Sequence, residues 1–178
     1  SDGRFDKYDT LATAEDLIRL YDVLESVWDR SDNHAVMTPL VVVANPDFDK
    51  IRESDYREYY YEPFTTTLQR YYPDQDVFTM WQEGMERGLF IPELHGRDHI
   101  AVPFWMNKLQ EGHPALRTAF NFGYVSLEVP GVPGPVSGFR AEFFFNREDQ
   151  KQLLEKAIDE SVSVFKDIFG HLPATFVP

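Results

Sequence analysis

The sequence predicts an α/β fold in which the strands run mainly parallel. Residues 36–44 form a nearly continuous apolar run rich in β-branched side chains, which is typical of a parallel strand covered on both faces. Residues 90–95 form a second short apolar run, and a helical pattern lies between the two. A strand, a helix and another strand in this order indicate a right-handed parallel crossover.

Amphipathic helices are predicted wherever apolar residues recur with a period near 3.6. The segments with this pattern are 14–29, 75–87 and 147–169. Thr13 is predicted to cap the first helix, and Asp74 or Asp76 the second, because short oxygen-bearing side chains accept hydrogen bonds from the first free amides. Asn146 with Asp149 is predicted to cap the third helix.

Composition excludes several classes of protein. With 178 residues, of which 43% are hydrophobic and 15% aromatic, the chain is long enough for one domain with a real core. A formal net charge of −13 argues against nucleic acid and against an anionic membrane surface as partners. The absence of cysteine excludes disulfides and thiolate ligands. The sequence shows neither a signal peptide nor a long apolar run, so we expect a cytoplasmic location and no membrane span.

The densest group of reactive side chains lies in residues 91–99, directly after a predicted strand. His95 and His99 are four residues apart, a spacing that places both imidazoles on one side of a turn or helix, where they can share a Zn²⁺-class ion. Arg97 and Asp98 between them are candidates for supporting the ligands or for contacting an anionic group. Two histidines at this spacing are also compatible with ordinary polar loop residues.

Other candidate site residues follow from their positions and chemistry. Asn45 and Asp47 come at the carboxyl end of the predicted strand 36–44, where parallel α/β folds place their sites, although Asn-Pro-Asp is also a common turn sequence. Tyr60, from an unusually aromatic segment, and Trp105 are the aromatic candidates for substrate contact. Tyrosine offers a flat apolar face with a polar tip, which suits binding to sugars.

Three short strings resemble a known protein group. VANPDF at 43–48, YYEPF at 60–64 and HGRDH at 95–99 are similar to sequences of uncharacterised bacterial proteins related to the NodB-type polysaccharide deacetylases. The similarity extends over most of the chain. It implies a distorted or partial (β/α) barrel, a carbohydrate substrate and a divalent metal, Zn²⁺ first, held by His95 and His99. Gly96 stands where those deacetylases carry a hydroxyl residue.

The chain departs from the deacetylase pattern at the first motif. Those enzymes carry an adjacent Asp-Asp pair, one member acting as base and the other as metal ligand, and this chain contains no such pair. The resemblance therefore predicts that 1–178 is a single deacetylase-like domain cut from a longer barrel. Further residues, or a partner chain as in a homo-oligomer, would then cover the open edge. Asp47 or Glu93 would substitute as a carboxylate ligand or base, with Asp98 as a third catalytic candidate.

The sequence is also compatible with two other functions. In a metal-free relative of the glycoside hydrolases, Glu93 would act with Asp47 or Asp98 as paired carboxylates. In a non-catalytic sugar-binding or structural domain, the tyrosine-rich segment 56–72 would supply the binding surface.

Overall fold

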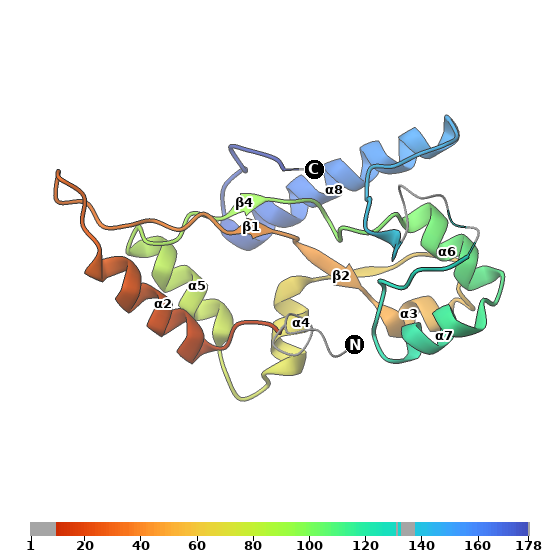
Figure 1. Cartoon of the computed structure of the whole chain (residues 1–178), viewed down its shortest axis with the longest axis horizontal. Helices are drawn as coiled ribbons and strands as arrows, with labels where there is room; N and C mark the ends of the chain where they lie inside the picture. The colour runs from red at the N-terminus through yellow and green to blue at the C-terminus, as the bar shows by residue number, and fades with distance from the viewer. Residues whose placement is uncertain (1–9, 131, 133–137, 178) are drawn as a thin grey trace. The chain divides into compact units, whose positions relative to one another are not determined.

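The computed structural model describes residues 10–130, 132 and 138–177, which form a mixed α/β structure (Figure 1). These residues contain seven helices and short strands in two-stranded sheets. Contacts divide the chain into two compact units. The described parts of Ser1–Pro39 and Thr65–Ile91 form the first unit, and those of Leu40–Phe64 and Pro92–Pro178 form the second.

The first unit is built around two helices that pack side by side, α2 (Ala14–Ser26) and α5 (Val77–Glu86). Both begin at the caps expected from the sequence. Thr13 Oγ1 accepts from the Asp16 amide at 3.2 Å, and Asp76 Oδ1 accepts from the Thr79 amide at 3.2 Å. Tyr21 of α2 is fully buried, and its hydroxyl donates to the Met80 carbonyl at 2.8 Å.

The second unit contains the parallel strand pair that the sequence predicts. Strand β1 (Leu40–Val41) pairs in parallel with β4 (Glu93–Leu94), and Phe176 adds a parallel bridge to Leu94. A separate antiparallel pair joins β2 (Ala44–Pro46) to β3 (Tyr61–Pro63). The parallel pairing of the two predicted runs is thus confirmed, but the antiparallel pair is at least as long, so the strands of the described residues are not mainly parallel. They form small sheets and close no barrel.

Proline explains why the strands are shorter than predicted. Pro39 and Pro92 have no amide hydrogen to donate, so the parallel ladder is interrupted at both positions. On one side of the interruption Met37 bridges Phe90 in parallel, and on the other side β1 pairs with β4. The apolar runs at 36–44 and 90–95 therefore give isolated pairings in place of two continuous strands.

Helices enclose the core of the second unit. They are α3 (Phe48–Glu53), α6 (Val102–Gln110) and α7 (Pro114–Asn121). Helix α8 (Asp149–Phe169) belongs to the same unit, whereas α4 (Phe64–Tyr71) lies in the first unit except for its first residue. The core side chains include Ile51, Trp105, Leu109, Leu116, Phe120 and Phe139. Helix α8 also contacts β4, so it lies beside the strand that leads into His95.

The start of α8 differs from the prediction. Its N-cap is Glu148, which is in helical conformation and makes no capping side-chain hydrogen bond to the residues that the structure describes. The backbone amides just before the helix are instead bound by Gln150. Its Oε1 accepts from the amides of Asn146 at 3.0 Å and Arg147 at 3.2 Å. An amide side chain reaching back from inside the helix replaces the expected Asn146 cap.

None of the helices in the described residues combines the length and apolar character that crossing a membrane requires.

Candidate functional site

The structure brings the two predicted imidazoles together. His95 follows β4, and its amide donates to the Val41 carbonyl at 2.8 Å. Gly96, at a φ of 106°, and His99, at a φ of 53°, turn the chain so that the His95 and His99 rings lie 4.8 Å apart between centroids. The angle between their planes is 31°. A turn with positive φ at both ends, and not a strand or helix, therefore produces the pairing.

The orientation of the His95 ring is set by a backbone carbonyl. Its Nδ1 lies 3.0 Å from the Val177 carbonyl oxygen, and because a carbonyl only accepts, Nδ1 carries the hydrogen. In the neutral ring Nε2 then keeps a free lone pair. Burial lowers the pKa of His99, and the neighbouring His95 and Arg140 lower that pKa further. Neutral imidazole with one nitrogen fixed by a carbonyl is the form that binds metals.

A complete metal site is not formed by the described residues. They contain no group of three or more histidine, aspartate and glutamate side chains placed to hold an ion. The two carboxylates considered as third ligands make other contacts. Asp47 Oδ1 accepts from the Lys50 amide at 3.0 Å as the N-cap of α3, and Glu93 Oε2 accepts from the amides of Ala174 and Thr175 at 2.9 and 2.8 Å. Among the described residues, His95 and His99 are therefore the two side chains of this site that could hold an ion.

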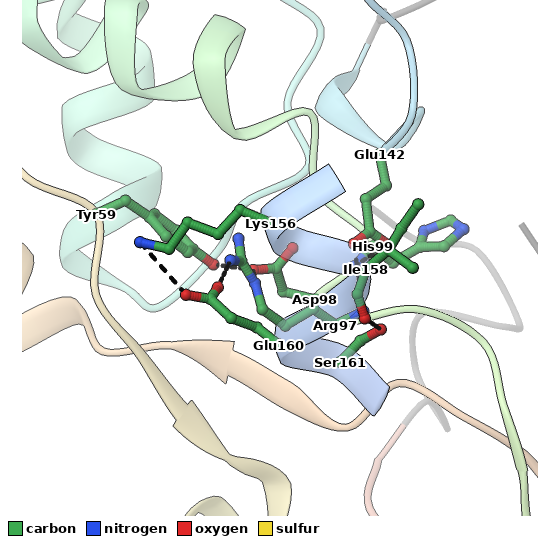
Figure 2. A network of polar contacts seen from close by, with 9 residues as sticks. All are labelled: Tyr59, Arg97, Asp98, His99, Glu142, Lys156, Ile158, Glu160 and Ser161. Carbon is green, nitrogen blue, oxygen red and sulfur yellow. Dashed lines mark hydrogen bonds and ion pairs between the residues drawn. The ribbon is translucent and has the colours of Figure 1, made fainter. Parts of the chain in front are cut away.

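Asp98 and Arg97 form the centre of a buried polar network (Figure 2). Arg97 Nε donates to Asp98 Oδ2 at 2.8 Å, and Arg97 Nη1 donates to Glu160 Oε2 at 2.5 Å. The Tyr59 hydroxyl also donates to Asp98 Oδ2, at 2.5 Å. The guanidinium lies over the rings of Tyr59 and Tyr61, at 5.1 and 4.8 Å from their centroids. The network thereby joins three parts of the chain, namely β3 with the residues just before it, the loop after β4, and α8.

Burial has the largest effect on the pKa values of the side chains in this network. It raises the pKa of Asp98 above its usual value, and Arg97 opposes that rise only in part. Among the described residues, Asp98 Oδ1 has no hydrogen-bond partner. The nearby Ile100 amide lowers the pKa of Asp98, but burial outweighs it. Burial also raises the pKa of Tyr59 well above 10, so its hydroxyl stays a donor. For Arg97 burial lowers the pKa, but Asp98 and Tyr59 raise it more, and the side chain remains charged.

Glu142 is a site residue that the sequence reasoning missed. Its carboxylate accepts from the Arg97 amide through Oε1 and from the His99 amide through Oε2, both at 3.2 Å. Burial, followed by the charge of Asp98, raises the pKa of Glu142 to about 7. The available signal was a single carboxylate directly before three consecutive phenylalanines at 143–145, because a charge in a strongly apolar segment usually has a specific partner.

A cavity of about 340 Å³ adjoins the network. Its polar lining includes Tyr59, Tyr61 and Arg97, and much of the rest is apolar and comes from α6 and α8. Tyr60, the tyrosine predicted to touch substrate, does not line the cavity, because side chains of consecutive residues in an extended chain point to opposite faces. Its hydroxyl donates to Glu58 Oε2 at 2.6 Å.

The remaining predicted residues lie outside this cavity. Trp105 is completely buried in the core, where its indole Nε1 has no hydrogen-bond partner within the described part of the chain. Asn45 lies in β2, in register with Glu62 of β3. A second depression, of about 280 Å³, is lined by His99, Arg140, Ala141, Glu142, Phe143 and Phe144. Glu142 thus borders both hollows, one of which contains an imidazole of the predicted pair.

Comparison of the chain with protein-family models, with curated proteins and with solved structures gave no match.

Proposed function

We propose that this chain is a metal-dependent, carbohydrate deacetylase-like hydrolase that acts on amide- or ester-linked acetyl groups. One observation carries the proposal, namely the side-by-side arrangement of His95 and His99 at 4.8 Å between ring centroids. The Val177 carbonyl supports it by leaving the Nε2 lone pair of His95 available. The resemblance of the HGRDH string implies the same two ligands, with Gly96 in place of the hydroxyl residue.

The chain's own residues preorganise the pair before any ion binds. Gly96 and His99 adopt the turn that joins the two rings, and Glu142 holds that turn through two backbone amides. A bound divalent ion would supply Lewis acidity toward an acetyl carbonyl. Two imidazoles bind such an ion weakly, so the affinity of this chain for Zn²⁺ is expected to be modest unless a further ligand completes the site.

The other two functions have less support. Paired-carboxylate hydrolysis needs acids free to act, whereas Asp47 caps a helix, Glu93 binds two amides and Asp98 is buried against Arg97 and Tyr59. A sugar-binding surface built on the tyrosines would use the cavity beside Tyr59 and Tyr61, but much of its lining is aliphatic.

Metal titration tests the proposal directly. Calorimetry with Zn²⁺, and Co²⁺ absorption as a second readout, should show one site in the wild-type chain. The site should be lost in His95→Ala and in His99→Ala. His171→Ala is the matched control, since His171 is exposed and packs on Phe165 of α8. Metal binding that survives both substitutions in the pair, or that is equally reduced in the control, would refute the assignment.

Hydrolysis is the second readout. Release of acetate from acetylated oligosaccharides by a metal-loaded preparation, and its loss in His95→Ala, would support the deacetylase class. Release from residues 1–178 alone is expected to be slow, because the chain lacks the Asp-Asp pair that supplies the base in those deacetylases. Acetate release that His95→Ala leaves unchanged would overturn the assigned reaction.

A further inference from the structure

Arg97 is a buried cation whose hydrogen bonds are only partly used. Its side chain is 8% exposed, and two carboxylates fix its orientation, Asp98 at Nε and Glu160 at Nη1. The guanidinium also packs over the rings of Tyr59 and Tyr61, which restricts its orientation. Nε and Nη1 donate to the two carboxylates (Figure 2), whereas Nη2 makes no hydrogen bond within the part of the chain that the structure describes. Two N–H donors on a rigid, buried guanidinium therefore lack a protein acceptor.

These unused donors belong to a residue that lines the 340 Å³ cavity. A guanidinium held on two sides loses little freedom when it binds a ligand, so its remaining N–H groups are preorganised for an anionic oxygen. Burial strengthens such a contact because the effective dielectric constant there is lower than in water. The volume is within the range of small-molecule sites.

The rest of the lining restricts the chemistry of the ligand. Two further cations, Arg57 and Lys156, line the cavity, and the Lys156 side chain is 72% exposed and holds Glu160 only at 3.5 Å. Lys156 can therefore turn toward a bound anion. The acids that line the cavity are Glu160, already shared by Arg97 and Lys156, and Glu142, which is bound to backbone amides. The cationic groups thus outnumber the acidic ones on a protein whose formal net charge is −13.

The apolar side of the cavity fits a compact hydrocarbon body. Val102 and Met106 from α6 face it, as do Leu153 and Leu154 from α8. Leu153 is 55% exposed although it is a large aliphatic residue, so a ligand that covered it would gain hydrophobic stabilisation. A strongly hydroxylated ligand would leave its polar groups against this wall without partners.

We propose that this cavity is a binding site for a small monocarboxylate with an apolar body, such as a short aliphatic acid. The carboxylate would accept from Arg97 Nη2 and from Lys156, and the hydrocarbon chain would lie against α6 and α8. The site is separate from the His95–His99 pair and does not rest on the proposed hydrolase function, so it is tested without metal.

Hexanoate and 1-hexanol form a matched pair of probes, because they share the alkyl chain and differ in the charged group. Amide chemical-shift titrations of the full chain at pH 7 with a metal chelator present should show hexanoate binding with a dissociation constant on the order of 0.1–1 mM. The shifts should concentrate in residues 97–106 and 153–160. Hexanol should bind at least about tenfold more weakly, as expected for the loss of one charge-assisted contact.

Two variants locate the site. Lys156→Ala removes an exposed cation without disturbing the core and should weaken hexanoate binding about tenfold, with little change for hexanol. Leu153→Asp should weaken both probes. Lys166→Ala, on the same helix but outside the cavity lining, is the control and should leave both affinities unchanged.

Equal binding of hexanoate and hexanol would overturn the proposal, as would hexanoate affinity that is unchanged by both Lys156→Ala and Leu153→Asp. A loss of hexanoate affinity in Lys166→Ala as large as that in Lys156→Ala would indicate nonspecific attraction to helix α8. That result would also refute the proposal. Arg97→Lys gives a further check where it folds, since lysine lacks the fixed fork and should bind hexanoate more weakly than wild type.

Discussion

A methyl group added at Gly96 would lie 2.3 Å from Oε2 of Glu142, closer than two such atoms can approach. The same carboxylate accepts from the amides on either side of Asp98, so it occupies the space that a side chain at position 96 would need. Gly96 also has a φ of 106°, which L-residues rarely adopt. Backbone conformation and close approach thus both require glycine between His95 and Arg97.

Gly96→Ala should therefore destabilise the protein by roughly 2–4 kcal/mol, because it adds backbone strain and displaces a buried carboxylate. Urea unfolding measures the change. Gly112→Ala is the matched control, since Gly112 has a φ of 76° but no atom of the described residues lies within 4 Å of the added carbon. Its cost should be limited to about 1–2 kcal/mol of backbone strain. Equal losses at both positions would contradict the close-contact explanation.

Glu142 should make stability fall as the pH rises. Its pKa is about 7 in the folded protein against 4.5 for the ordinary side chain, so between these values the folded state binds more protons than the unfolded state. The difference corresponds to about 3 kcal/mol as an upper value, present below pH 4.5 and lost as the pH passes through 7. Glu142→Gln should remove this component. Unfolding free energies of both proteins at pH 5, 6, 7 and 8 test it, and a wild-type-minus-variant difference that is independent of pH would rule it out.

The hydroxyl of Tyr59 should matter far more than that of Tyr60. Tyr59 donates to the buried Asp98 at 2.5 Å, whereas Tyr60 donates to an exposed glutamate, Glu58. Tyr59→Phe should cost roughly 1.5–3 kcal/mol, the usual range for a hydrogen bond to a charged group. Tyr60→Phe should change the free energy of unfolding by less than about 0.5 kcal/mol. Similar losses for the two variants would mean that the buried network contributes little.

Glu93 should hold the C-terminal segment against β4. Its Oε2 accepts from the amides of Ala174 and Thr175, and the next contact along the segment joins the Val177 amide to the Leu94 carbonyl at 3.0 Å. Glu93→Ala should speed hydrogen exchange at Val177 about tenfold or more, because the segment opens more often once the anchor is lost. Glu155→Ala, an exposed change on α8, is the control.

The same Glu93 substitution has a consequence for the imidazole pair. Since the Val177 carbonyl orients His95, loosening the segment should also weaken metal binding if the proposed metal site exists. Unchanged exchange at Val177 in Glu93→Ala would show that other contacts hold the segment.

Local features of the sequence determined the elements that short-range chemistry specifies. Apolar periodicity placed α2, α5 and α8 close to their observed bounds, and Thr13 and Asp76 cap two of them as expected. The run of apolar residues after Ala35 indicated the parallel pairing of β1 with β4. The four-residue spacing of His95 and His99 indicated that their rings would meet. Each of these depends on residues near one another in the chain, or on a single strand pairing.

Only the tertiary structure decided the surroundings of those histidines. Glu142 and Glu160 reach the loop at 96–99 across 43 to 63 residues of sequence, and Tyr59 reaches Asp98 across 39. No periodicity specifies such partners, because a buried carboxylate is selected by the geometry of unsatisfied donors that exists only after the chain has folded. The sequence likewise does not specify that Tyr59 and Tyr61, and not Tyr60, line the cavity. That outcome depends on which face of the extended segment the cavity occupies.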